Sequence, residues 1–561
     1  MRRSTSGQRE SRRVRQQRTI GNVTRRSRAI AVAATVVMGV LAGCASGTTD
    51  GGSQGAGEPK SGGTLRALNL GPVACLAPHG SSSWQDGYIR TQIFDQLTYQ
   101  DPETGEISPW LASSWTVSAD ATQYTFEIRD GVTFSDGSAL TAEVVRDNLD
   151  ELGKGDPAKG IPASNQLANY GEATVTGPNE VLVTLTGPSA GFLQALSTSR
   201  QGIVGEATLA LTGDERCASG DKVITSGPFT FASSQQDSEI VVVRRDDYNW
   251  GPEKLGHTGP AYLDKIVYTT VAESSVRVGS LLAGQADAAI FILPTDHEIV
   301  DSANGYHLDS NDVGSVQQLT INPDTPGLDD VRVRQALIAA TDRDALIDTI
   351  LNDRYQVANS FLGSRNPGYV DLSGKLEYDP DRAAALLDEA GWILGTDGIR
   401  AKAGKQLVVP AYISPTQVTA KPLMEYLQNE WRKLGIVLDL KAADTATYAK
   451  VTKDPSVNAF NQTSPTGLTP ATLRRAWHSS FTNIVNHTYP ELDALLTEQD
   501  AAVDPAEQDR LIAAASNFIA DNALSIPLYE DKLVYGVSDQ VHGAGVDAQG
   551  RALYVTAWLD N

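Results

Sequence analysis

The sequence predicts an α/β or α+β protein with more than one lobe. Strand-like runs rich in β-branched and aromatic residues occupy 124–129, 181–185 and 240–243. They alternate along the chain with segments that carry helix-capping residues, which is why strands and helices are expected to mix throughout. The chain of 561 residues also exceeds the ~250–300 residues at which a single hydrophobic core stops growing. Two or more lobes are therefore expected.

The helices are predicted from the residues that begin and end them. Asp379 is an N-cap followed by Pro380 at the first helical position, and the Ala/Leu run after it ends at Gly391. Other helices are expected over 142–152, 331–351, 419–434 and 492–522, the last split near residue 504.

Residues 1–43 are predicted to be a secretion signal and not part of the fold. Ten arginines and one glutamate precede an apolar run over 29–42. A basic segment, a short apolar segment and small residues are typical of a cleaved signal, and this run is too short to cross ~30 Å of hydrocarbon as a helix. The Arg25-Arg26 pair leaves open whether export uses the general or the twin-arginine route.

Leu41-Ala42-Gly43-Cys44 resembles the bacterial lipobox, which implies cleavage before Cys44 and its diacylation. The alternatives are an uncleaved anchor or a chance cysteine after a signal. Residues 44–61 are rich in Gly and Ser and are predicted to be a flexible tether. The protein is thus expected to lie outside the cytoplasm, lipid-anchored to the outer face of the cell membrane.

The predicted mature chain is strongly acidic. The whole chain has 46 Lys and Arg and 68 Asp and Glu. Without the ten arginines and one glutamate of the signal, 36 and 67 remain, which gives a net charge of −31 over 518 residues. Such a surface argues against nucleic acid as a partner and against binding anionic lipid by charge.

Cys75 and Cys217 are the cysteines that remain after Cys44. Two cysteines in an oxidising compartment have one possible pairing, so a disulfide between them is expected. The alternatives are two free thiols or a metal site in which Cys75 and His79 would need a third ligand that the sequence does not show.

A family resemblance rests on blocks that occur in a fixed order. The densest block covers 91–150 and includes Tyr124-Thr-Phe-Glu-Ile-Arg-Asp-Gly131 and Phe134-Ser-Asp-Gly137. Shorter blocks follow at 225–229, 262–266, 284–287, 330–337, 384–391 and 526–529. Together they resemble family 5 of the extracellular solute-binding proteins, the dipeptide- and oligopeptide-binding lipoproteins of ABC importers. The resemblance spans about residues 62–561.

The resemblance implies a two-lobed α/β fold of the periplasmic-binding-protein type. Lobe I would comprise residues 62–318 plus 523–561, and lobe II residues 319–522. Crossovers near 318–322 and 525–529 would join them, with the ligand between the lobes. The protein would bind a small solute and pass it unchanged to a separate ABC permease. It would be a monomer with no catalytic residue, no cofactor and no metal.

Ligand residues are expected in two segments and at two single positions. The loop 74–88 follows the first strand and corresponds to a cleft loop in the family, while 459–467 is the matching stretch of lobe II. The candidates are His79, Trp84 and Tyr88 in the first segment, Asn461, Gln462 and Thr463 in the second, and Trp477 and Tyr529 elsewhere. The alternative for the aromatic residues is packing in a lobe core, and for His79 a place on the surface.

The stretch 459–467 departs from the family pattern. Peptide-binding members have an Asp there that pairs with the ligand's α-ammonium, whereas this stretch has no acidic residue. A buried ammonium without a carboxylate is costly. Amides and hydroxyls instead favour a neutral, hydroxyl-rich or amide-rich solute, such as an oligosaccharide or a capped or modified peptide.

The sequence also bears on three other functions. A metal chelate is possible for the family, but seven scattered histidines argue against direct metal ligation. A hydrolase would need a nucleophile elbow or a zinc-binding His-Glu-x-x-His motif. The spacing Gly-x-Ser-x-Gly occurs at 51–55 and at 187–191, and His-Glu-x-x-His does not occur in the sequence. A ligand sensor that kept the fold without transport remains an alternative.

Overall fold

The computed structural model describes residues 57–80, 84–167, 169–189 and 191–560. The predicted signal over 1–43, Cys44 and most of the predicted tether lie outside the described residues. Residues 56–561 form one compact unit. Within the described part of the chain, no helix combines the length and the apolar composition that a membrane crossing requires.

An eight-stranded mixed sheet runs through the unit. Its strand order is β18-β12-β19-β11-β1-β10-β9-β8. β1 pairs in parallel with β10 and β11, and the other neighbours are antiparallel. The bounds are β1 Thr64–Asn69, β8 Phe229–Gln235, β9 Glu239–Arg244, β10 Lys265–Thr270, β11 Ala288–Ala289, β12 Tyr306–Ile321, β18 Phe460–Thr463 and β19 Ser525–Ser538.

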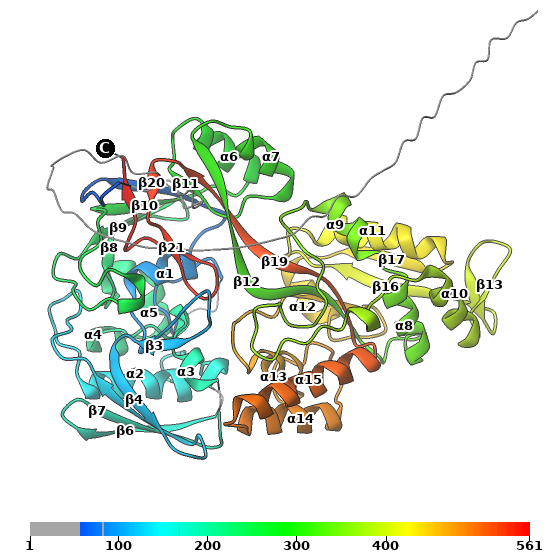
Figure 1. Cartoon of the computed structure of the whole chain (residues 1–561), viewed down its shortest axis with the longest axis horizontal. Coiled ribbons are helices and arrows are strands. Elements are labelled where there is room, and N and C mark those ends of the chain that lie inside the picture. Colours follow the sequence, from blue (N-terminus) through cyan, green and yellow to red (C-terminus); the bar gives the residue numbers. More distant parts are fainter. Residues whose placement is uncertain (1–56, 81–83, 168, 190, 561) are drawn as a thin grey trace, which may run out of the picture. The chain divides into compact units, whose positions relative to one another are not determined.

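Two long strands of this sheet, β12 and β19, connect two hydrophobic cores. They pair from Tyr306 opposite Ser538 to Thr320 opposite Ser525, and Figure 1 shows them crossing side by side between two groups of elements. Val313 and Leu533 pack in one large cluster, whereas Leu319 and Ile526 pack in the other. We call the parts around these clusters lobe I and lobe II.

Lobe I contains a second, antiparallel sheet covered by a helix. Its order is β4-β5-β7-β6, and α2 packs against β6 and β7. The helix approaches so closely that a Cβ at Gly153 would lie 2.1 Å from the ring of Tyr170. The elements are β4 Ala112–Val117, β5 Gln123–Ile128, α2 Ala142–Lys154, β6 Tyr170–Gly177 and β7 Glu180–Leu185.

Shorter elements complete lobe I. They are α1 Gly87–Ile93, β2 Thr98–Gln100, β3 Ile107–Pro109, α3 Phe192–Ala195, α4 Glu206–Leu209, α5 Gly213–Ala218, α6 Ser274–Leu282, α7 His297–Asp301, β20 Val541–His542, β21 Gly545–Val546, β22 Ala552–Leu553 and β23 Trp558–Leu559. A small cluster that includes Leu281, Val300 and Val534 packs α6 and α7 against the large sheet.

Lobe II is mostly helical. Its parallel pair β16–β17 is covered by the intervening helix α11. The elements are α8 Val331–Ala339, α9 Arg343–Ile350, α10 Pro380–Glu389, β13 Ile393–Leu394, β14 Arg400–Lys402, β15 Lys405–Gln406, β16 Val408–Ile413, α11 Ala420–Lys433, β17 Val437–Ala442, α12 Thr445–Val451, α13 Thr472–Trp477, α14 Pro490–Ala501 and α15 Pro505–Asp521.

The helix starts predicted at Asp379 and near residue 504 are confirmed, and the single helix predicted over 331–351 is wrong. Asp379 accepts a hydrogen bond from the backbone N–H of Arg382 and begins α10, as predicted. Asp504 begins α15 and separates it from α14. The single helix expected over 331–351 is instead two helices, because the Asp342 side chain accepts from the N–H of Ala345 and starts α9.

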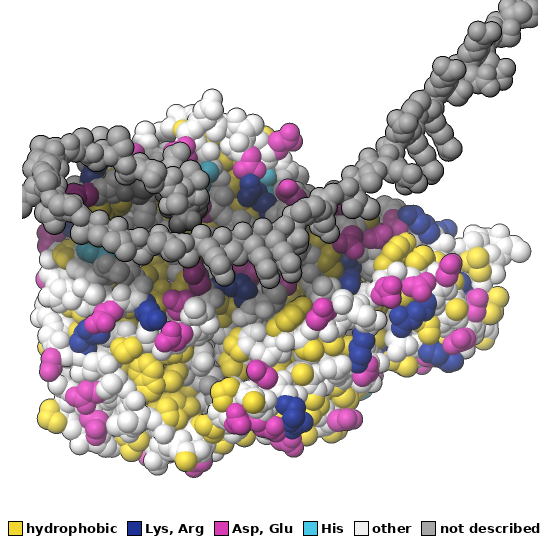
Figure 2. Space-filling view, in the orientation of Figure 1, with side chains coloured by type: hydrophobic (Ala, Val, Ile, Leu, Met, Phe, Trp, Pro, Cys, Tyr) yellow, Lys and Arg dark blue, Asp and Glu magenta, His cyan; other side chains and the backbone are white. Residues whose placement is uncertain are grey.

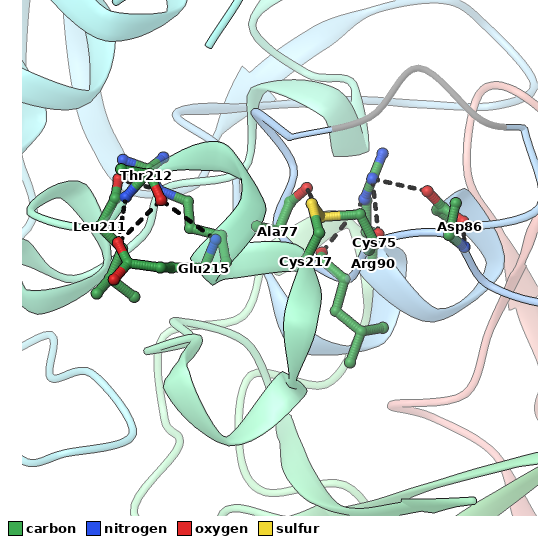
Figure 3. The surroundings of a disulfide bond; sticks show 11 residues. Cys75, Ala77, Asp86, Arg90, Leu211, Thr212, Glu215 and Cys217 are labelled. Atoms are coloured by element: carbon green, nitrogen blue, oxygen red, sulfur yellow. Dashed lines mark hydrogen bonds and ion pairs between the residues drawn. A yellow bond between two sulfur atoms is a disulfide. The ribbon is translucent and has the colours of Figure 1, made fainter. Parts of the chain in front are cut away.

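The disulfide between Cys75 and Cys217 is present. It joins the loop before α1 to α5 (Figure 3). Next to it, Arg90 donates to the carbonyl oxygen of Cys75 at 2.8 Å and pairs with Asp86 at 3.0 Å. The predicted lobe boundaries at residues 318/319 and 522/523 stay a prediction.

Candidate ligand-binding cleft

A pocket lies between the two lobes. It encloses about 770 Å³, including the solvent at its mouth. Lobe I contributes residues next to α3 and from the C-terminal loop, and lobe II contributes α13 and the loop before it. The polar residues that line it are Gln100, Asn165, Gln166, Asn169, Ser189, Gln194, Ser197, Thr198, Asp547 and Gln549 from lobe I, and Thr466, Thr469, Arg474, Arg475 and Asp500 from lobe II. We call it the inter-lobe pocket.

Direct contacts hold the two lobes together around this pocket. The amide nitrogen of Gln100 donates to the carbonyl oxygen of Leu468 at 2.6 Å, and that of Asn169 donates to Oδ2 of Asp500 at 3.1 Å. A Cβ at Gly191 would lie 2.8 Å from Oγ1 of Thr469, so the backbone of lobe I touches lobe II. The structure therefore describes the lobes in contact.

Asp500 is a buried carboxylate at this contact. Its side chain is 3% exposed, and Nη1 of Arg474 lies 2.6 Å from its Oδ2. Burial raises the pKa of Asp500 to about 6, against the opposing effects of Arg474 and Asn169. Since Asp500 already has both partners, it is a structural link between the lobes.

Three other arginines at the junction have few acidic partners. Nη2 of Arg475 donates to the carbonyl oxygen of Thr466 at 2.6 Å, but neither Arg475 nor Arg200 forms an ion pair with any described carboxylate. Arg551 lies over the ring of Trp84 at 4.0 Å and 3.5 Å from Asp547.

The charges of these arginines act on one another. Burial, and then the charge of Arg200, lower the pKa of Arg475 to about 10. Burial and the charge of Arg551 likewise lower the pKa of Arg200. Burial is the larger cause in both cases, and a neighbouring positive charge adds to it.

A second, smaller pocket lies beside the crossing strands and encloses about 400 Å³. The hydroxyls of Tyr529 and Thr419 are 2.8 Å apart there, and the ring of Tyr355 meets that of Tyr529 edge-on at 5.7 Å. Asp531 accepts from Oγ of Ser464 at 3.2 Å. Burial raises the pKa of Asp531 to about 6. We call this the crossover pocket.

His79 lies inside lobe I and lines neither pocket. Its ring nitrogens face acceptors on both sides, with Nδ1 2.6 Å from Oε1 of Glu151 and Nε2 3.1 Å from the carbonyl oxygen of Gly202. Arg216 holds the same carboxylate with two bonds of 2.6 and 2.7 Å. Burial raises the pKa of Glu151, but Arg216 and His79 outweigh it and lower that pKa to about 2.

Trp84 and Tyr88 adjoin the arginine cluster. Nε1 of Trp84 donates to the hydroxyl of Tyr88 at 3.2 Å, and the Trp84 ring supports Arg551. Tyr88 is 2% exposed, and burial raises its pKa to about 12. Trp84 therefore positions a charged group, while Tyr88 belongs to the core of lobe I.

The predicted lobe II residues are mostly committed to internal contacts. Asn461 donates to the carbonyl oxygen of Ile484 at 2.6 Å and Gln462 to that of Tyr412 at 3.0 Å. Thr463 pairs with Gln318 in the sheet, and Trp477 is 1% exposed against Phe361. Of the eight predicted ligand residues, only Tyr529 lines one of the two pockets.

Sequence reasoning missed the charged residues that line the two pockets: Arg474, Arg475, Asp500, Asp531, Lys532 and Asp547. Arg474 and Arg475 follow closely after the stretch 459–467, which departs from the family pattern. Their position in the sequence could have indicated them as candidates. Among the described residues, no group of three or more His, Cys, Asp and Glu side chains is arranged to hold a metal ion.

The surface carries charges of both signs. On the face drawn in Figure 2, Lys and Arg side chains are interspersed with Asp and Glu and do not gather into one basic area. That face offers no surface of the kind that binds a polyanion.

Comparisons with known proteins identify the family. The model of the bacterial extracellular solute-binding proteins, family 5 middle region, matches residues 106–483. The glutathione-binding protein GsiB of Escherichia coli K12 is 26% identical over 480 residues, which cover 83% of this chain and 89% of GsiB.

Solved structures share the fold. The oligopeptide-binding protein AppA of Bacillus subtilis, solved with a nonapeptide, gives a TM-score of 0.75 at 22% identity and covers 90% of this chain and 100% of its own. NikA of Brucella suis, solved with Fe(III)-EDTA, gives 0.76 at 23% identity and covers 89% and 100%. The two-lobed α/β fold expected from the sequence is confirmed. The chain belongs to family 5 of the bacterial extracellular solute-binding proteins, whose members are extracytoplasmic components of ABC importers and not enzymes.

Proposed function

We propose that this protein captures a peptide-like or other small polar solute outside the cytoplasm and delivers it unchanged to an ABC permease. The observation that carries the proposal is the inter-lobe pocket, which is lined by polar residues of both lobes. A site divided in this way is complete only when the lobes are together. A solute that contacts both lobes therefore stabilises that arrangement.

The crossing strands give such a movement a plausible structural basis. β12 and β19 are the strands that pass from one core to the other, and their pairing is irregular between Asp312 and Val316 and again between Gln317 and Gln318. We propose that the lobes, 62–318 with 523–561 and 319–522, rotate about this region. The contacts of Gln100 and Asn169 with lobe II would form on closure.

The names of relatives suggest which solutes to test first. GsiB binds glutathione, AppA was solved with a nonapeptide and NikA with Fe(III)-EDTA. The missing acidic residue in 459–467 supports peptides without a free α-ammonium, and oligosaccharides and metal chelates remain alternatives. Asn461 and Gln462 donate to carbonyl oxygens of their own lobe, whereas Thr463 pairs with Gln318. Ligation by these three residues stays a prediction.

We also propose that the protein is held at the membrane by lipid on Cys44. Support comes from the Leu-Ala-Gly-Cys sequence at 41–44 and from the Gly- and Ser-rich segment that follows. Each buried CH₂ of an acyl chain adds ~0.8 kcal/mol of membrane affinity. The protein would act as a tethered monomer and would pair with its permease through diffusion at the membrane surface.

A ligand screen tests the main proposal. The full chain carrying Cys44→Ser would be melted with glutathione, with free and capped tripeptides, with oligosaccharides and with metal chelates. A true ligand at 100 times its Kd adds ~2.7 kcal/mol of stability, which raises Tm. The scattering radius should fall on binding as the lobes close. If no compound raises Tm or compacts the protein, the proposal is wrong for these solute classes.

A further inference from the structure

A third and larger pocket lies within lobe I. It encloses about 1340 Å³, including the solvent at its mouth. Its wall is formed by the carboxyl ends of the parallel strands β1 and β10, the turn between β8 and β9, the loop before α1 and the end of α5. The described residues that line it lie between 69 and 270, and none of them lines the inter-lobe pocket. We call it the lobe I pocket.

Part of this pocket is apolar. The rings of Phe231 and Tyr268 line it together with the aliphatic side chains of Val73, Ile89 and Ile240. Tyr268 and Ile89 are at most 2% exposed and belong to the core of lobe I. Such a wall favours the carbon stem of an organic molecule over a fully hydrated ion, because covering apolar surface removes it from water.

A buried acceptor without a partner lies in the same wall. Asn69 is the last residue of β1 and is 3% exposed. Its Oδ1 has no hydrogen-bond partner among the residues that the structure describes. A buried acceptor left in this state destabilises the fold, whereas a donor that reaches it removes the penalty. A bound molecule with an N–H group would supply that donor from the pocket.

The uncompensated charge of the lining is negative. Asp237 lies in the turn between β8 and β9, and Glu239 begins β9. Neither carboxylate forms an ion pair within the described part of the chain. Arg216 also lines the pocket, but the Glu151 carboxylate already holds its guanidinium with two bonds of 2.6 and 2.7 Å. The potential in the pocket therefore favours a cation and disfavours an anion.

We propose that the lobe I pocket binds a small organic cation, an amine or a guanidine on an apolar stem. The stem packs against the rings of Phe231 and Tyr268, and the cationic group donates to Oδ1 of Asn69 in the negative potential of Asp237 and Glu239. Aromatic rings add to the attraction, because the face of a ring attracts a cation. This site goes beyond the proposed function, since it lies in one lobe and needs no closure.

The disulfide provides a local signal of occupancy. Both Cys75 and Cys217 line the lobe I pocket, where they join the loop before α1 to α5 (Figure 3). Cys75 is 3% exposed and Cys217 is half-buried. A molecule in the pocket should therefore obstruct the approach of a reductant to the two sulfur atoms.

The test compares ligands that share one ring and differ in charge. Tyramine, tyrosol and 4-hydroxyphenylacetate carry an ammonium, a hydroxyl and a carboxylate, and agmatine is an aliphatic cation. Calorimetry on the full chain carrying Cys44→Ser would measure binding. Tyramine should bind about 10-fold more tightly than tyrosol, from weak ion pairing together with a ring contact, and the carboxylate should bind most weakly.

The rate of disulfide reduction by dithiothreitol would locate the bound amine. At roughly nine times its Kd, about one tenth of the pockets stay empty, so reduction should slow by about 10-fold. Tyrosol at the same concentration should slow it much less. Glutathione or a peptide that binds in the inter-lobe pocket should not displace the amine.

Variants assign the preference to the lining. Asp237→Asn and Glu239→Gln should each lower the tyramine-to-tyrosol affinity ratio, and together they should bring it close to one. Asp237 has φ of +57°, a conformation that Asn also adopts, so the fold should be kept. Asn69→Ala should weaken tyramine binding by removing the acceptor. Glu172→Gln is the matched control, because Glu172 is an exposed glutamate on β6 of the other lobe I sheet, and it should keep the full ratio.

A preference for tyramine or agmatine over tyrosol, with protection of the disulfide, would support the inference. Equal binding of tyramine and tyrosol, or no binding of either amine at millimolar concentration, would overturn it. Amine binding that leaves the reduction rate unchanged, or a ratio that the Asp237→Asn, Glu239→Gln double variant does not alter, would also overturn it, because the amine would then bind elsewhere. Each of these negative results would leave the proposed function standing, since that function depends on the inter-lobe pocket.

Discussion

Replacing Glu151 by Gln tests the interpretation of His79 as a structural residue. Arg216 forms two hydrogen bonds with the Glu151 carboxylate, and its side chain is 0% exposed, against 7% for that of Glu151. The neutral amide would leave a buried guanidinium without its counter-charge. Removing one partner of a buried pair costs about 3–5 kcal/mol, so Glu151→Gln should be strongly destabilising.

The pKa of Glu151 gives a second estimate and a pH window. Its value falls from 4.5 to about 2 in the folded protein, and each unit corresponds to 1.36 kcal/mol, or roughly 3 kcal/mol in total. Because the folded pKa is depressed, this stability is present above pH 4.5 and is lost as the pH falls toward 2. The stability of the Gln variant should lack this part of its dependence on pH.

Thermal melts from pH 7 to pH 3 would measure both effects. Solute affinity should stay unchanged in molecules that remain folded, because the Glu151–His79 pair lies inside lobe I and lines neither pocket. A triple variant, Glu151→Leu with Arg216→Met and His79→Phe, should recover much of the lost stability, since it removes all three members of the buried group and apolar replacement of buried ion pairs is often neutral or better. A loss of less than about 1 kcal/mol in Glu151→Gln, or a selective loss of binding, would refute the reasoning.

Three other changes probe the lobe contact, the disulfide and the crossover pocket. Asn169→Asp places a carboxylate beside that of Asp500, so the lobes should close less readily and the affinity for every solute, measured by calorimetry, should fall. An unchanged affinity would show that the contact between Asn169 and Asp500 does not contribute to closure. Cys217→Ser removes the disulfide that joins residues separated by 142 in the sequence. Chain entropy predicts a loss of up to about 5 kcal/mol of stability. The Tm of the variant should fall to that of the wild-type protein with its disulfide reduced. Asp531 has a raised pKa of about 6, so its effect on stability is favourable at low pH and is lost as the pH rises through 6. Asp531→Asn should flatten the change in Tm between pH 5 and pH 7, and an unaltered slope would show that Asp531 does not titrate there.

Local signals in the sequence predicted the fold well because they act over a few residues. Asp379 and Pro380 begin a helix wherever the chain continues with helix formers, and Asp504 divides two helices for the same reason. The error over 331–351 has the same origin. Asp342 is itself a good N-cap, and its signal was overridden by the length of the apolar pattern on both sides.

The candidate site was harder to predict because its residues come together only through the packing of two lobes. Gln100, Arg475 and Gln549 line the inter-lobe pocket but are far apart in the sequence, and each alone resembles an ordinary surface residue. The aromatic residues Tyr88 and Trp477 are instead buried in the lobe cores. Burial of a large ring removes more apolar area from water than burial of a small side chain. Residue type therefore indicated packing more reliably than it indicated ligand contact.

The lining of the inter-lobe pocket is balanced in charge although the chain is acidic, because Arg474 and Arg475 line it together with Asp500 and Asp547. The chain has 68 acidic and 46 basic residues, so a random group of arginines would be expected to find carboxylates nearby. Many cations of the described residues nevertheless bond to carbonyl oxygens and not to carboxylates, as Arg277, Arg343 and Arg475 do. The contacts that close the pocket are therefore mostly neutral hydrogen bonds, such as that of Gln100 with Leu468. Each contributes only about 1 kcal/mol. A solute that contacts both lobes can then supply the free-energy difference between the open and closed states, which a protein that must close on its solute and open without it requires.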